Sequence, residues 1–276
     1  MNLVKSAKSG FLQQVKFLVK MGADIHAQDD DALRWSADNG HLDIVKFLVE
    51  SGADLHAQDD DALRTSAEYG HLEVVKFLVE SGADIHSRDD KALMWSAKRG
   101  HLEVVKFLVE SGADVNAQDD LALLWSAPNG HLDIVKFLVG QGADVHASDN
   151  HALRTSANRG HLDIVKFLVE QGANIYAQGD HALKQSAHHE HLHVVKYLMT
   201  FYTIPQLNSL DITLVNDILK KWNLAAKVIQ QACHNWLYSP MCRDNTIGIV
   251  PRLEWQKIQG LIKSTILKKK MIYKNK

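Results

Sequence analysis

A unit of thirty residues recurs without insertion or deletion from residue 1 to about residue 199 of this 276-residue chain. Residues 40–49 read GHLDIVKFLV. The same ten residues return at 70–79, 100–109, 130–139 and 160–169, with only Asp/Glu and Ile/Val exchanged. A fixed period of roughly 20–50 residues is typical of a stacked array of repeats. The period therefore predicts a solenoid in which each copy packs against its neighbours.

Each unit carries the signals of two short helices. The first is expected to begin after an Asp or Asn that can accept hydrogen bonds from the helix's first N–H groups, and to end about nine residues later at a glycine. The second helix, HLDIVKFLVE in repeat two, places an apolar stripe on one side and charges on the other. The capping column is Asp30, Asp60, Asp90, Asp120, Asn150 and Asp180, and the stripe is Leu42, Val45, Phe47, Leu48 and Val49.

One such unit is too small to fold by itself. Thirty residues bury too little apolar surface to offset the conformational entropy lost on ordering them, so the identical faces of neighbouring units must complete each core. The repeated ten residues are therefore interpreted as packing residues, and the columns that change between units are the candidates for function.

The string GHLDIVKFLV followed by Gly-Ala-Asp-Leu-His-Ala resembles the ankyrin repeat over about 200 of the 276 residues. The thirty-residue length and the wording DDALRWSA…GHLDIVKFLV further resemble the ankyrin proteins of giant DNA viruses. The resemblance implies an all-α solenoid of stacked antiparallel helix pairs with projecting hairpin loops. It also implies a non-enzymatic scaffold that binds a partner protein through its concave face.

The unit departs from the family pattern at its loop. Ankyrin repeats usually run to about 33 residues, with Thr-Pro-Leu-His opening the first helix. Here Ala32-Leu33-Arg34 occupies the Pro-Leu-His place and three loop residues are absent. We expect the Asp30 column to supply the missing cap. The shortened loop puts the β-hairpin in doubt, so binding would depend more on the concave helix face.

Two regions follow from the repeat register. Residues 1–200 are predicted to form the array, with an atypical first unit (Phe11 replaces His) and last unit (Glu190 replaces Gly). Residues 201–276 are predicted to form a helical extension that caps the last repeat and ends in a basic tail. The net charge of −2 is uneven, because 252–276 carry eight Lys/Arg and one acid (+7), which leaves −9 for the rest.

The variable columns of the first helix predict where a partner binds. The family resemblance places them on the concave groove, and Trp and Arg are enriched in binding hot spots. Their charge changes from acidic to basic along the array, which would orient a partner of opposite gradient. The alternative is that the Trp rings fill space between repeats. The predicted contact residues are Trp35, Asp38, Asn39, Arg64, Glu68, Tyr69, Trp95, Lys98, Arg99, Trp125, Asn129, Arg154, Asn158 and Arg159.

The histidines invite a metal interpretation that their spacing opposes. His41 recurs every thirty residues, and stacked helices about 8–10 Å apart cannot share one ion; we interpret these histidines as turn residues. His189-Glu190-His191-Leu192-His193 fits H-E-x-x-H, but that chemistry needs one continuous helix, and the repeat register places this string across a turn. No catalytic residue, metal site or cofactor is predicted.

The C-terminal residues leave one alternative open. Ile229-Gln230 resembles the start of a calmodulin-binding IQ motif whose later positions are missing, and the tail LKKKMIYKNK could be a nuclear address or a nucleic-acid contact. The alternative function is therefore a nucleic-acid-associated or nuclear-targeted adaptor. Two cysteines, no signal peptide and no apolar span favour an intracellular protein, not secreted and without membrane contact. We expect the chain to be monomeric. Its partner would be an unidentified protein, of the host cytoplasm or nucleus if the viral resemblance holds.

Overall fold

The computed structural model describes residues 2–202. In this range the chain forms fourteen α-helices, one short 3-10 helix and no strand. The predicted all-α solenoid is therefore confirmed. The shortened loops form no β-hairpin in the described repeats. One compact unit covers Met1–Leu198. The predicted helical cap, the IQ-like segment and the basic tail lie outside the described residues and stay predictions.

Each repeat contributes a first and a second helix. The first helices are α1 (Leu3–Lys8), α3 (Ala27–Asp38), α5 (Ala57–Glu68), α7 (Ser87–Arg99), α9 (Ala117–Ser126) with η1 (Ala127–Asn129), α11 (Ala147–Arg159) and α13 (Ala177–His188). The second helices are α2 (Leu12–Lys20), α4 (Leu42–Glu50), α6 (Leu72–Glu80), α8 (Leu102–Glu110), α10 (Leu132–Gly140), α12 (Leu162–Glu170) and α14 (Leu192–Met199).

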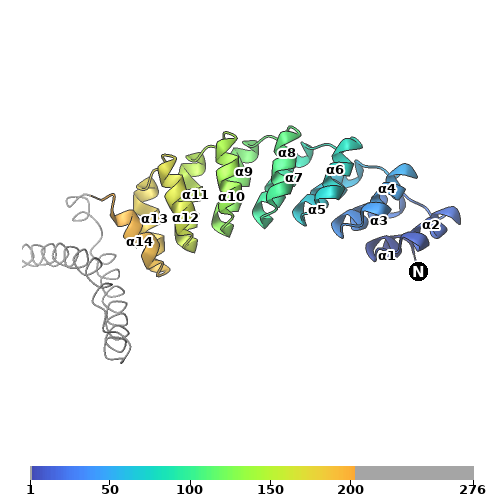
Figure 1. Ribbon diagram of the computed structural model, residues 1–276, viewed down its shortest axis with the longest axis horizontal. Coiled ribbons are helices and arrows are strands. Elements are labelled where there is room, and N and C mark those ends of the chain that lie inside the picture. The colour runs from blue at the N-terminus through green and yellow to red at the C-terminus, as the bar shows by residue number, and fades with distance from the viewer. Residues whose placement is uncertain (1, 203–276) are drawn as a thin grey trace, which may run out of the picture. The chain divides into compact units, whose positions relative to one another are not determined.

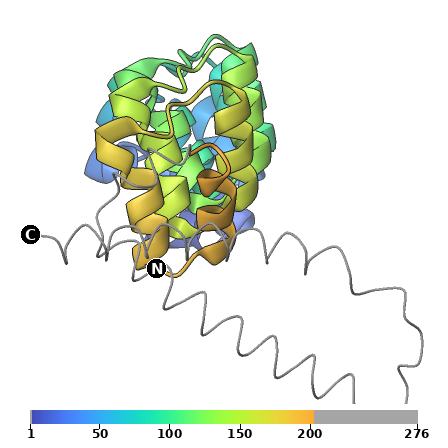
Figure 2. The ribbon, with the colours of Figure 1, turned by 90° about the vertical axis from the view of Figure 1, so that its left-hand side faces the viewer.

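The helix pairs stack in chain order along a gentle arc (Figure 1). Viewed nearly end-on, the helices of successive repeats lie behind one another in two rows (Figure 2). The first helices of neighbouring repeats are in much closer contact than the second helices are. The tighter row must lie on the inside of the curve, so the first helices form the concave side of the array. We call their solvent-facing side the inner face.

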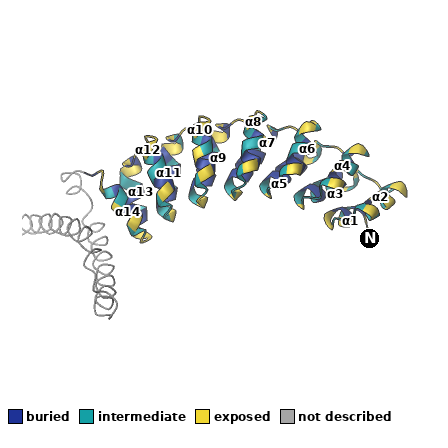
Figure 3. Ribbon diagram, viewed as in Figure 1, coloured by how far each residue is buried: buried dark blue, intermediate teal, exposed yellow. Residues whose placement is uncertain are grey.

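The core is a continuous layer between the two rows (Figure 3). In repeat two, α3 contributes Ala32, Leu33, Ser36 and Ala37, and α4 contributes Ile44, Val45 and Leu48, all buried. The predicted stripe of the second helix was only partly right. Val45 and Leu48 are buried, but Leu42, Phe47 and Val49 are half-buried, and Ile44 was missed. The stripe is narrower because each second helix has close neighbours only on its inner side.

The loop that joins the second helix of one repeat to the first helix of the next lies along one side of the array, which we call the loop edge. There, three consecutive residues of each repeat adopt the left-handed conformation. Gln28, Asp29 and Asp30 have φ of 59°, 54° and 57°, and the pattern recurs in every following repeat through 178–180. The right-handed helix begins only after this turn. Left-handed conformations cost non-glycine residues about 1–2 kcal/mol each, least for Asp and Asn. The single left-handed turn therefore replaces the family's hairpin and needs support from its surroundings.

The Asp30 column supplies part of that support, but it does not act as the predicted helix cap. Asp30 Oδ1 accepts a hydrogen bond at 3.0 Å from the backbone N–H of Asp54, in the loop of the next repeat. The ring of His26 lies 3.2 Å from Asp30 Oδ2. The same bridge joins Asp60 to Asp84, and it recurs at later junctions. The short side chain is thus used between repeats, because the left-handed turn points its oxygens toward the following loop.

The opposite side of the array carries the turn between the two helices of each repeat, and we call it the turn edge. Here a glycine and a histidine hold neighbouring repeats together. His71 Nε2 bonds the Asp38 carbonyl of the preceding repeat at 2.9 Å, and its ring packs directly on Gly40. Gly40 has φ of +72°, and a Cβ there would lie 2.5 Å from His71 Nδ1. This column needs glycine for its conformation and for the ring. The interpretation of these histidines as structural turn residues is confirmed.

Candidate functional site

The predicted contact residues lie on the first helices or directly at their C-terminal ends, as Asn39 and Tyr69 do, but their side chains make different contacts within the array. The position that reads Trp35, Thr65, Trp95, Trp125 and Thr155 is half-buried in every repeat. Both threonines are satisfied locally, since Thr65 Oγ1 and Thr155 Oγ1 donate to carbonyls one turn earlier at 2.8 Å. The three tryptophans are only partly buried and are therefore the aromatic groups of the inner face.

Repeats four and five form an aromatic and cationic cluster. The Trp95 and Trp125 rings meet edge to face, with centroids 5.8 Å apart and planes at 73°. The Lys98 ammonium lies 4.5 Å from the centre of the Trp95 ring and 4.8 Å from that of Trp125. A cation over two indole faces is held by the negative electrostatic potential of the rings. The rings do bridge two repeats, as the space-filling alternative proposed, yet both stay partly open to solvent.

Trp35 forms a separate, smaller cluster in repeat two. The Lys8 ammonium lies 3.4 Å from its ring centre and the Arg34 guanidinium carbon lies 4.4 Å from it. Asp38 is close by, and burial raises the pKa of its carboxyl, while Lys8 and Arg34 act in the opposite direction. Two cations already occupy the Trp35 ring, so less of it is left for a partner.

Among the polar candidates, several side chains are engaged within the array. Arg99 binds Glu68 of the preceding repeat at 2.6 Å. The Asn39 and Asn129 amides close the last helical turn by donating to the Trp35 and Trp125 carbonyls. Such exposed contacts contribute little stability and can be exchanged for contacts with a partner.

The remaining candidates differ mainly in how exposed they are. Tyr69 is 51% exposed, one of the few large aromatic side chains left so open in the described residues. Asn158 is half-buried, and Arg159 is exposed. Tyr69 and Arg159 are therefore accessible to a partner, as are the exposed Asn39, Arg99 and Asn129.

Arg64 and Arg154 are the two predicted contacts that the structure places in the interior. Arg64 is 8% exposed and donates at 2.9 Å to the carbonyls of both Gln58 and Asp59. Arg154 does the same for Ser148 and Asp149 in repeat six. The guanidinium groups satisfy the carbonyls of the left-handed turn. They offer little surface to a partner, so they are not among the proposed contacts.

Sequence reasoning missed one variable column. The first right-handed residue of each first helix reads Asp31, Asp61, Lys91, Leu121, His151 and His181, all half-buried on the inner face. Burial, with Arg154 nearby, lowers the pKa of the last two histidines. The Nδ1 atom of His181 is buried and has no hydrogen-bond partner among the described residues. This column varies as much as those that were chosen, so the same criterion could have found it.

The His189–His193 string crosses the turn between α13 and α14, as the register predicted. Helix α13 ends at His188, Glu190 has φ of 64°, and α14 begins at Leu192. His191 and His193 each bond a carbonyl of the preceding repeat at 2.9 Å. Between residues 2 and 202, no group of three or more His, Cys, Asp or Glu is arranged to hold a metal ion. The string lacks the continuous helix that its motif requires.

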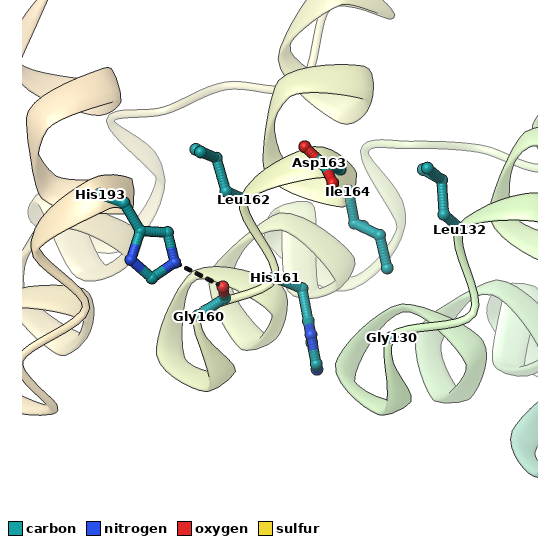
Figure 4. Close-up of a pocket in the computed structure, with 8 residues that line it drawn as sticks. All are labelled: Gly130, Leu132, Gly160, His161, Leu162, Asp163, Ile164 and His193. Atoms are coloured by element: carbon teal, nitrogen blue, oxygen red, sulfur yellow. Dashed lines mark hydrogen bonds between the residues drawn. The ribbon is translucent and has the colours of Figure 1, made fainter.

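A shallow hollow of about 410 Å³ lies at the turn edge between repeats five and seven (Figure 4). Both histidines of its lining are already hydrogen-bonded, because His193 bonds the Gly160 carbonyl at 2.9 Å and His161 bonds the Pro128 carbonyl at 3.0 Å. Asp163 is the only carboxylate in the lining, which also includes Leu132, Leu162 and Ile164. The hollow offers few converging groups, so the inner face remains the stronger candidate.

Stacked helix pairs whose variable columns gather on one face define a helical solenoid repeat protein. The family model for ankyrin repeats in three copies matches residues 3–89, 63–149 and 123–209, and the chain belongs to the ankyrin repeat family. A search of curated proteins finds no match. Ankyrin repeats generally mediate protein–protein interaction, and their proteins are typically non-enzymatic scaffolds. In the described residues, no helix is both long and apolar enough to cross a membrane.

Proposed function

We propose that this chain is a non-enzymatic, monomeric scaffold that binds one partner protein through the inner face. One observation carries the proposal: four columns that change from repeat to repeat, those of Asp31, Trp35, Asp38 and Asn39, lie half-buried or exposed on the first helices or at their ends. The constant columns of Leu33, Ala37 and Val45 are buried in the core instead. Stacking fixes the constant columns, so the changing ones are free to serve recognition. The proposed contacts centre on Trp95, Lys98 and Trp125, with Tyr69 and Arg159 at their flanks.

The proposal extends to the setting of the protein. The thirty-residue unit supports the short-repeat type found in giant DNA viruses, and such a protein would act inside the host cell on a host protein. Without a hairpin, the loop edge offers no projecting finger. The inner face must therefore supply most of the contact area.

Site-directed photo-crosslinking tests the location of the partner. A photoreactive amino acid is placed at Tyr69, Asn129 or Arg159 on the inner face. Matched controls carry it at Glu103, Asp133 or Asp163, which are exposed on the second helices. We expect one partner to be captured from cell extract at the inner positions and not at the outer ones. Equal capture from both sets would refute the proposed face.

A triple variant tests the same proposal without a probe. Trp95→Ala, Lys98→Ala and Arg99→Ala remove half-buried or exposed side chains, so helicity should stay unchanged and thermal stability should drop only slightly. Partner capture should be lost. Retained capture by a well-folded triple variant would show that the cluster takes no part in binding.

A further inference from the structure

The inner face divides into two halves of different charge. The right-handed parts of the first helices in repeats two and three, residues 31–38 and 61–68, contain four acids and two arginines. The corresponding parts in repeats four to seven, 91–99, 121–129, 151–159 and 181–188, contain no acid and six Lys/Arg. The six are Lys91, Lys98, Arg99, Arg154, Arg159 and Lys184.

In the first half, the charges partly neutralise one another. Arg34 pairs with Asp31 at 2.5 Å and lies 3.7 Å from Asp61. Arg64 pairs with Asp61 at 2.6 Å. Glu68 is occupied by Arg99 at 2.6 Å. The four acids and two arginines sum to −2, and the pair with Arg99 of repeat four offsets one of the acids, so this half of the face has no positive charge with which to attract an anionic partner.

In the second half, four of the six cations lack acidic partners and are not buried. Lys91, Lys98, Arg159 and Lys184 make no ion pair with any residue of the described range. Arg159 and Lys184 are exposed, and Lys91 and Lys98 are half-buried against the Trp rings. Uncompensated like charges along one concave face create a positive potential that favours an anionic partner.

The exposed acids of this half lie elsewhere. Asp89, Asp119 and Asp149 belong to the left-handed turns at the loop edge. Gln118 bonds Asp89 at 3.3 Å, and Gln178 bonds Asp149 at 3.2 Å. An anionic segment is therefore directed away from the loop edge and along the helices, where the Trp95 and Trp125 rings offer the apolar surface.

We propose that repeats four to seven bind an acidic peptide segment with an apolar anchor side chain. The carboxylates pair with Lys98, Arg159 and Lys184, and the anchor packs beside the Trp95 and Trp125 rings. This inference rests on the proposed function, since it names the chemistry of the partner at the same face. The last twenty-five residues of the chain carry +7, so the chain's own tail has the wrong charge to be the occupant.

Fluorescence anisotropy with the full chain tests the chemistry directly. The first probe is a labelled fifteen-residue peptide of Glu, Ser and Gly with one central Leu. The second replaces the Leu by Gly, and the third replaces every Glu by Lys. We expect the first probe to bind at least about tenfold more tightly than either of the others. Its affinity should fall as salt is raised, because the charge pairs are partly exposed to solvent.

Charge reversal places the binding on this face. Lys98→Glu with Arg159→Glu should weaken the first probe at least about tenfold. The matched control, Lys136→Glu with Lys166→Glu, makes the same change in net charge on α10 and α12 and should leave the affinity within about twofold. Equal loss in both variants, or no loss in either, would overturn the inference, because binding would then follow overall charge or the tail.

Two further outcomes separate this inference from the proposed function. If a twenty-base-pair DNA duplex binds more tightly than the peptide and loses affinity in the Lys98→Glu, Arg159→Glu variant, the face recognises nucleic acid and the acidic-peptide inference fails. If the crosslinked partner binds the charge-reversed variant as well as the parent chain, the inference also fails. In that second case the proposed function stands, because the partner is still captured on the inner face.

Discussion

The two edges of each repeat junction are held by different chemistry. At the turn edge, almost the same clasp recurs: a left-handed glycine, a histidine ring packed on it, and a ring nitrogen bonded to a carbonyl of the preceding repeat. At the loop edge, the left-handed turn and its Asp or Asn bridge recur, but the side chains that support the turn change. The turn edge therefore keeps the same contact at each junction, whereas the loop edge tolerates substitution of the side chains that support its turn.

Because the loop edge tolerates different supporting side chains, two adjacent positions of the first helix vary together. Repeats three and six have Arg followed by Thr at these positions, whereas repeats four and five have Met or Leu followed by Trp. Arg64 and Arg154 bind the carbonyls of the turn, and a small Thr follows each. Met94 and Leu124 are buried instead, and the Trp that follows each carries exposed surface. A repeat can thus support its turn with a buried cation or with apolar packing and an adjacent ring. The second arrangement leaves the aromatic group available for binding.

The turn edge should give the largest loss when it is changed. Gly100→Ala forces φ of +90° on an alanine and places its Cβ 2.6 Å from the His131 ring. Backbone strain and overpacking together should reduce the free energy of unfolding by about 3 kcal/mol. Urea unfolding followed by circular dichroism measures the loss.

Two other glycines separate the causes. Gly112 has φ of +110° with open space around it, so Gly112→Ala should lose only the strain, about 1–2 kcal/mol. Gly140 closes α10 and meets nothing within 4 Å, so Gly140→Ala should be neutral or slightly stabilising. A Gly100→Ala variant as stable as Gly112→Ala would show that the histidine ring moves aside without loss.

At the loop edge, the bridging carboxylate should come next. Asp60 is 4% exposed, and its Oδ1 accepts from the Asp84 N–H at 2.8 Å. Asp60→Ala leaves that N–H unpaired and should lower the free energy of unfolding by about 2 kcal/mol. Asp60→Asn should lose less than half of that, because Asn150 makes the same bridge to Asn174 at 2.7 Å. If the two variants are equally unstable in urea, the bridge needs a charge and our account of it is wrong.

The supporting arginines should show a smaller effect. Arg64→Met removes the donors to the Gln58 and Asp59 carbonyls and should reduce the free energy of unfolding by about 1–2 kcal/mol. The matched Arg34→Met removes partly exposed ion pairs, in which the Arg34 side chain is 24% exposed, and should change the free energy of unfolding by less than about 0.5 kcal/mol. Thermal melting of both variants measures the two losses of stability. Similar losses would mean that the carbonyl contacts add nothing beyond surface pairing.

The repeat period determined most of this fold in advance, because a thirty-residue unit that cannot bury its own core has to stack. The helix bounds, the glycine turns and the structural histidines followed from that. The left-handed turn did not, since Gln28-Asp29-Asp30 also reads as an ordinary helix cap. At the inner face, sequence variation selected Trp95 and Lys98 as candidate contacts, which stays a prediction, and it could not separate exposed from buried arginines. Arg34 and Arg64 occupy the same position of the unit, and only the neighbouring Trp or Thr distinguishes their surroundings.

The smallest effect is expected in the pH dependence of stability, which compares a histidine at the turn edge with two on the first helices. Burial lowers the pKa of His101 at the turn edge, and of His151 and His181 on the first helices, below the usual 6.5. Just below pH 6.5 the unfolded chain then binds protons that the folded chain does not, so stability falls as the pH falls. Well above pH 6.5 both states are neutral at these histidines and their contribution is fully present.

Substitution assigns that loss to one of the edges. His151→Gln with His181→Gln should flatten the dependence of the urea midpoint between pH 6.5 and 5.5 while leaving it unchanged at pH 8. Burial raises the pKa of Asp38 and Asp120 above 3.8, so these carboxyls make the opposite contribution, increasing stability on acidification at lower pH. An unaltered slope in the double variant would place the acid sensitivity at the turn edge, with His101, because its ring is the one still desolvated at a junction.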